Sequence, residues 1–143
     1  MKRLLFDFNV ALDVLFERKA HFAEAAALWQ ASKQGRLCGL LPAHGLTTIH
    51  YLVRQQKGGE FARQALTDLL NVFHVAGVDE AVIHRAAALN WTDFEDAVVA
   101  AAAEVASCDA VVSRDPAGFS GCPVPVLTPK AALALLQSEP EAS

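Results

Sequence analysis

Short apolar runs and longer stretches of helical spacing alternate along the chain. The short runs lie at residues 3–7, 38–41, 72–75, 110–113 and 124–127, and each is typical of a buried strand. Helical spacing covers residues 9–18, 21–34, 44–56, 60–71, 79–90 and 93–107, and a last helix begins at Pro129. Strands that alternate with helices predict a parallel sheet with helices on both faces. The pattern therefore predicts an α/β fold with a mainly parallel, roughly five-stranded sheet.

Residues with strong positional preferences indicate where several of these helices begin and end. Asn9 is a good N-cap for the first helix, and Gly35 is a C-cap signal for the second. Thr92 and Glu95 match a capping box, in which Thr92 is the N-cap and Asp93 is the first residue of the helix.

Length and composition limit the class of protein. A chain of 143 residues predicts one domain, which we place at residues 1–137, with a frayed tail at 138–143. No apolar run reaches the ~20 residues of a membrane span, and Asp7 interrupts the N-terminus too early for a signal peptide, so we expect a cytoplasmic protein. The net charge of −4 argues against a protein that coats DNA, but is compatible with a nucleic-acid enzyme.

Carboxylates stand where predicted strands end, and ligands of such sheets bind beyond the carboxyl ends of the strands. Asp7 follows the first strand, and Arg114 and Asp115 follow the fourth. Asp93 and Asp96, three residues apart at the start of a helix, share one of its faces.

Each acid also has a structural interpretation. Asp93 would complement the positive end of the helix dipole, and Asp115 would suit a turn before Pro116. Asp96 is harder to explain in this way, because residues 97–103 are all Ala or Val and predict a buried helix. A buried carboxylate without a partner is costly, and several of them at one sheet edge repel one another. A divalent cation removes both costs, and all-oxygen ligands favour Mg²⁺ or Mn²⁺.

Two segments, "FDFNVALDVL" and "DFEDAVVAAAAEVASCDAVVSRDPAGF", together with the order of elements over nearly the whole chain, resemble the PIN domain family, which includes toxin ribonucleases of the VapC type. The resemblance implies a three-layer α/β/α sandwich and Mg²⁺- or Mn²⁺-dependent hydrolysis of RNA phosphodiester bonds. It also implies a homodimer and a small antitoxin as partner. Asp7, Asp96 and Asp115 match three family acids, Ser113 matches the hydroxyl residue before the last acid, and Asn9 matches the polar residue two after the first.

One family acid is absent. The family usually carries a glutamate on the helix after the second strand, and in "LPAHGLTTIHYLVRQ" the matching position is Thr48. Asp93 compensates in one interpretation; in the others the site is weakened or inactive. Thr48 or Ser113 would orient the attacking water in an active site. Arg114 would contact a substrate phosphate or lie at the surface.

Three alternatives to a nuclease follow from the same residues. A phosphatase with an aspartate nucleophile usually has a second aspartate two residues on, where this chain has Asn9. A response-regulator receiver needs an acidic pair and a phosphorylated aspartate after the third strand, and only Asp79 is near that place. The third alternative is a catalytically weak or inactive PIN-fold module that binds RNA or a protein.

Overall fold

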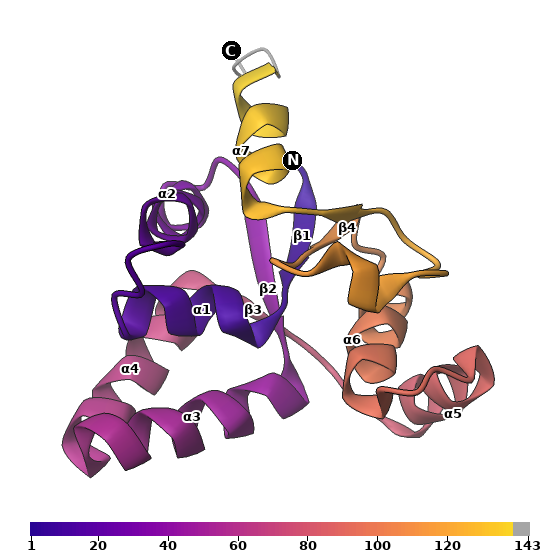
Figure 1. Cartoon of the computed structure of the whole chain (residues 1–143), viewed down its shortest axis with the longest axis horizontal. Helices are drawn as coiled ribbons and strands as arrows, with labels where there is room; N and C mark the ends of the chain where they lie inside the picture. The colour runs from indigo at the N-terminus through magenta and orange to yellow at the C-terminus, as the bar shows by residue number, and fades with distance from the viewer. Residues whose placement is uncertain (139–143) are drawn as a thin grey trace.

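A five-stranded sheet separates two layers of helices in the computed structural model, which describes residues 1–138 (Figure 1). The strands are β1 (Arg3–Phe6), β2 (Cys38–Pro42), β3 (His74–Ala76), β4 (Ala110–Val112) and β5 (Val126–Leu127). The helices are α1 (Phe8–Leu15), α2 (Phe22–Lys33), α3 (Ala43–Lys57), α4 (Gly59–Val72), α5 (Glu80–Leu89), α6 (Phe94–Val105) and α7 (Pro129–Ser138), with a 3₁₀ turn η1 (Pro116–Phe119).

All pairings in the sheet are parallel, in the order β3-β2-β1-β4-β5. β1 is central, and its Leu4 lies opposite Gly39 of β2 on one side and Ala110 of β4 on the other. Because the strands are parallel, their carboxyl ends all lie at one edge of the sheet. This edge is where Asp7 and Ser113 directly follow β1 and β4.

Alternate residues of the strands pack on opposite faces, as the pleat requires. Leu4 and Phe6 belong to a core that they share with α1, α2, α3, α4 and α7. Leu5 points the other way, into a second core formed with α5, α6 and η1. The predicted three-layer α/β/α sandwich with a five-stranded parallel sheet is confirmed, and the apolar character of both strand faces follows from helices on both sides.

The main differences from the sequence prediction lie at element ends. The third strand begins at His74, two residues later than predicted, because α4 continues to Val72. The fifth strand is only Val126–Leu127. Ser138, which was predicted to lie in a frayed tail, is the last residue of α7, and the rest of that predicted tail lies outside the described residues. No helix within residues 1–138 is long and apolar enough to cross a membrane.

Candidate active site

Asp7 occupies the junction between β1 and α1. Its backbone N–H donates to the carbonyl of Val112 at 3.0 Å, so it extends the pairing of β1 with β4 by one residue. Helix α1 begins at Phe8, which makes Asp7 the N-cap residue and corrects the prediction that Asn9 holds this position. The Asp7 side chain makes no capping hydrogen bond and is 8% exposed. Its carboxylate is therefore buried at the sheet edge without the usual role of a cap.

Ser113 connects two of the predicted acids at the end of β4. Its hydroxyl donates to Asp7 Oδ2 at 3.4 Å and accepts from the backbone N–H of Asp115 at 3.1 Å. Ser113 itself is 1% exposed. The carboxylate that follows β1 and the turn that follows β4 are thus tied together through one buried hydroxyl group.

The start of α6 brings two further acids to the same edge. Asp93 is the N-cap, and its side chain accepts from the backbone N–H of Asp96 at 3.1 Å. The prediction that Thr92 caps this helix is wrong by one residue, and Asp96 is the third residue of the helix rather than the fourth. Asp93 therefore has a structural role, the satisfaction of a free N–H group, that Asp96 does not have.

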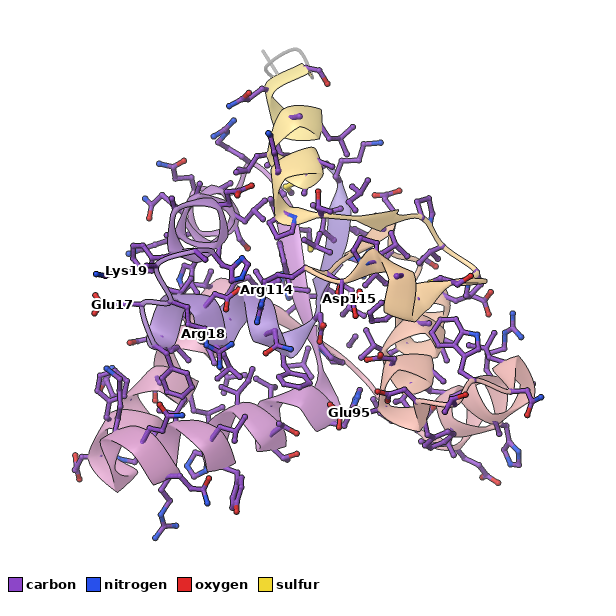
Figure 2. All side chains as sticks on the ribbon, viewed as in Figure 1. Glu17, Arg18, Lys19, Glu95, Arg114 and Asp115 are labelled. Carbon is purple, nitrogen blue, oxygen red and sulfur yellow. The ribbon has the colours of Figure 1, made fainter. Side chains whose placement is uncertain are left out.

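These acids converge on one pocket of about 280 Å³ at the carboxyl edge of the sheet, which we call the acidic pocket. Its lining residues are Asp7, Phe8, Asn9, Asp93, Glu95, Asp96, Ser113, Asp115 and Phe119. A Cβ atom at Gly118 would lie 3.4 Å from an oxygen of both Asp96 and Asp115, so these two carboxylates flank the same backbone position. Figure 2 shows Asp115 and Glu95 on one face of the molecule. The sequence had not indicated that Phe8, Glu95 and Phe119 line the site.

Mutual repulsion and burial shift the protonation of Asp96. Burial, followed by the charges of Asp93, Asp7, Glu95 and Asp115, raises the pKa of Asp96 from 3.8 to about 6. The sequence predicted a carboxylate that is costly to keep charged, and the pocket around Asp96 has this property.

The pKa of Asp7 is also raised, chiefly by burial. The nearby backbone N–H of Phe8 and the hydrogen bond from Ser113 oppose the rise, as does the charge of Arg114, whereas the charge of Glu95 adds to it. Asp7 Oδ1 is buried and has no hydrogen-bond partner among the described residues. A buried carboxylate oxygen without a donor is the kind of atom that a cation satisfies.

The donor chemistry of the acidic pocket fits a hard divalent cation, because the charged ligands that it offers are carboxylates. No three His, Cys, Asp or Glu side chains within residues 1–138 stand close enough together to hold an ion as they are. A cation would therefore have to draw the carboxylates of Asp7, Asp96 and Asp115 together.

Thr48 is not among the residues that line the acidic pocket. Helix α3 begins at the sheet edge and leads away from α6 (Figure 1), so a residue in its second turn lies farther from the acids than one in its first. In that first turn, both ring nitrogens of His44 are buried and lack a hydrogen-bond partner among the described residues. Burial lowers the pKa of His44, and the nearby charge of Glu95 opposes this. His44 of α3 thus has an electrostatic link to the pocket through Glu95.

Arg114 does not line the acidic pocket either, although both of its sequence neighbours do. Its Nε lies 2.9 Å from Oδ2 of Asp13, a fully buried residue of α1 that was not predicted to be a site residue. The sequence did contain one indication that Asp13 is buried, because it is the charged residue within the apolar stretch "VALDVLF".

The chain belongs to the PIN domain family, whose match covers residues 3–117. Members of this family are typically nucleases that use a divalent metal ion. No curated protein sequence matches the chain closely enough to count as a relative.

Several solved structures share the fold at low sequence identity. FitAcB from Neisseria gonorrhoeae is 20% identical, with a TM-score of 0.68 over 89% of this chain and 98% of that one. DNA-bound VapBC from Salmonella typhimurium is 13% identical, with a TM-score of 0.70 over 90% and 99%. VapC20 from Mycobacterium tuberculosis, a toxin that cleaves the sarcin-ricin loop, is 16% identical, with a TM-score of 0.61 over 76% and 86%. At these identities the similarity establishes the fold.

Proposed function

We propose that this chain is a Mg²⁺- or Mn²⁺-dependent ribonuclease that hydrolyses RNA phosphodiester bonds, as the toxin of a toxin–antitoxin pair. The observation that carries the proposal is the meeting of Asp7, Asp96 and Asp115 in one pocket, where none of them makes an ion pair with Lys or Arg of residues 1–138. Carboxylates that repel one another and lack cationic partners destabilise the metal-free fold, so a structural role alone does not account for them.

The polar residues predicted from the sequence have distinct parts in this proposal. Asp7, Asp96 and Asp115 hold the cation, and Asp93 adds negative charge at the rim while capping α6. A bound cation lowers the pKa of a coordinated water and offsets negative charge on the phosphate. Ser113 fixes the positions of Asp7 and Asp115 relative to each other, since its hydroxyl is hydrogen-bonded to both Asp7 Oδ2 and the Asp115 backbone N–H.

One residue of the acidic pocket, Asn9, orients the reactants in the proposed site. Asn9 lines the pocket beside Asp7 and offers a polar side chain to a water molecule or to the ribose–phosphate backbone. Thr48, another candidate from the sequence, is not among the residues that line the pocket and has no part in the proposal.

The test is degradation of RNA by the purified chain with Mn²⁺, with Mg²⁺ and with EDTA. We expect cleavage with either metal, none in EDTA, and none with Asp96→Asn. The matched control is Asp68→Asn, which removes an exposed carboxylate on α4. Absence of cleavage by the wild-type chain with metal, when it still binds RNA, would favour the inactive RNA-binding module instead.

We further propose a homodimer and a small antitoxin as partners. The support is the fold shared with proteins of toxin–antitoxin complexes, such as one from Klebsiella pneumoniae with a TM-score of 0.66 at 20% identity. Light scattering at micromolar concentration tests the dimer, and a monomeric mass would contradict it. Co-purification with the product of an adjacent short reading frame tests the antitoxin.

A further inference from the structure

Asp13 lies between two arginines that are far apart in the sequence, Arg18 and Arg114. Asp13 Oδ1 lies 3.2 Å from Arg18 Nη1, and Asp13 Oδ2 lies 2.9 Å from Arg114 Nε. The second contact is an ion pair without the alignment of a hydrogen bond. The Asp13 side chain is 1% exposed, so the carboxylate that contacts the two guanidinium groups is buried.

The end of α1 explains why Arg18 reaches Asp13. Glu17 has a left-handed backbone with φ of 49°, and its N–H donates to the carbonyl of Val14 at 3.1 Å. The N–H of Arg18 donates to the carbonyl of Asp13 at 3.0 Å. These two bonds form a Schellman motif, which usually brings a residue back over the helix it has just left. Figure 2 shows the result: Arg18 turns in toward Arg114, whereas Glu17 and Lys19 point outward.

The two arginines, which we call the arginine pair, keep unused donors and an unbalanced charge. One carboxylate serves two guanidinium groups, so the trio carries a net positive charge. Arg114 contacts Asp13 through Nε, which holds one of the five N–H groups of its guanidinium. The side chains of Arg18 and Arg114 remain 34% and 28% exposed. N–H groups without an acceptor among residues 1–138 therefore remain within reach of solvent.

The arginine pair borders the acidic pocket. Arg18 Nη1 lies 3.3 Å from Oδ1 of Asn9, which lines that pocket. Arg114 follows Ser113 directly, and its charge lowers the pKa of Asp7. On its other side, Arg114 lines a separate hollow of about 270 Å³ together with His21, Glu24, Thr128, Pro129 and Lys130. The pair thus lies between the acidic pocket and this hollow.

We propose that the arginine pair, held in place by Asp13, is a phosphate-binding subsite for the RNA nucleotide next to the scissile bond, an assignment that rests on the proposed ribonuclease function. The acidic pocket repels the RNA backbone on its own, and a fixed positive site at its border offsets that repulsion. Planar guanidinium groups suit a phosphate because two parallel N–H donors match two phosphate oxygens. Asp13 keeps both side chains ordered, which reduces the entropy lost when the phosphate binds.

The test measures binding of a short single-stranded RNA by fluorescence anisotropy in EDTA, where the proposed cleavage does not occur, over a series of salt concentrations. Arg18→Gln and Arg114→Gln should each raise the Kd roughly fivefold, the size of a charge-assisted hydrogen bond weakened by solvent. Each should also make the slope of log K against log salt shallower by about 0.7, the value for one lost phosphate contact on a single strand. Arg114→Lys should keep the slope, because the charge remains.

The matched control is Arg36→Gln, an exposed arginine just before β2, at the opposite edge of the sheet. It should leave the salt slope unchanged. The double variant Asp13→Asn with Arg114→Gln removes the buried carboxylate together with its partner, so a loss of binding in this variant does not arise from an uncompensated charge.

The outcomes separate this inference from the proposed function. If both glutamine variants keep the wild-type Kd and salt slope while Asp96→Asn abolishes cleavage, the subsite is wrong and the ribonuclease stands. If Arg36→Gln made the slope of log K against log salt equally shallow, this would also overturn the subsite, since RNA would then bind to positive charge anywhere on the surface. A wild-type chain that neither binds nor cleaves RNA would overturn both.

Discussion

The Ser113 hydroxyl donates to Asp7 Oδ2 at 3.4 Å, and this contact joins the ends of β4 and β1 at the acidic pocket. The Ser113 hydroxyl oxygen also accepts a hydrogen bond from the backbone N–H of Asp115 at 3.1 Å. One buried side chain thereby sets the position of the first and last acids relative to each other. Its removal should affect the charge of Asp7 more than the fold as a whole.

Ser113→Ala should raise the pKa of Asp7 further, because the Ser113 hydrogen bond now lowers it. The stability cost should be about 1 kcal/mol, the typical value for one hydrogen bond. Carbon-detected NMR titration of the Asp7 carboxyl group measures the first effect and urea denaturation the second. An unchanged Asp7 titration would show that the 3.4 Å contact is too weak to matter.

Asp96→Asn should melt no lower than the wild type in EDTA, because it removes a carboxylate that burial and four neighbouring acids disfavour. The variant should gain little when Mn²⁺ is added, whereas the wild type should gain about 2.7 kcal/mol at a metal concentration of 100 Kd. Differential scanning fluorimetry with and without metal provides both values. A variant that melts well below wild type in EDTA and keeps its metal response would place Asp96 in the scaffold.

The stability of the metal-free protein should fall as pH rises through the range in which Asp96 ionises. The folded-state pKa of Asp96 is raised from 3.8 to about 6, so its stabilising contribution is fully present below 3.8 and is lost as pH rises through 6. Urea denaturation in EDTA should show the wild type losing more stability than Asp96→Asn over this range. Parallel curves for the two proteins would contradict the raised pKa.

Gly118→Asp should strengthen the response to Mn²⁺, because a Cβ at this position would lie 3.4 Å from an oxygen of Asp96 and of Asp115. The added carboxylate should also lower the melting temperature in EDTA through repulsion. Thr48→Glu is the matched control, since Thr48 does not line the acidic pocket, and it should change neither value. Isothermal titration calorimetry with Mn²⁺ measures the difference. Tighter binding by Thr48→Glu would restore the family position of the missing glutamate.

Asp13→Asn should destabilise the protein, because two arginines lose the carboxylate that lies between them. Breaking a fully buried pair typically costs ~3–5 kcal/mol, and the partial exposure of both arginines reduces this to about 1–3 kcal/mol. Chemical denaturation measures the loss, with Asp68→Asn on the exposed face of α4 as control. Equal free energies of unfolding for Asp13→Asn and Asp68→Asn would show that the contacts of Asp13 with Arg18 and Arg114 do not stabilise the fold.

Much of this protein follows from its sequence because the signals are local. The alternation of apolar runs with helical spacing predicts the parallel sheet, and Asp7, Ser113 and Asp115 follow their strands directly in the chain. The carboxyl ends of parallel strands share one edge, so acids at those ends are brought to one place by the fold class alone. The convergence of the carboxylates was predictable for this reason.

Only the tertiary structure decided which way other side chains point. The start of α6 lies one residue later than predicted, so Asp93 caps the helix and accepts the N–H of Asp96 instead of standing in its first turn. Helix α3 leads away from α6 at the sheet edge (Figure 1), and Thr48 is not among the residues that line the acidic pocket; no local pattern encodes this direction. The contact between Asp13 and Arg114 joins α1 to the turn after β4, and it exists because packing brings these distant segments together. The sequence thus determined where the acids lie along the chain, and packing between distant segments determined what surrounds them.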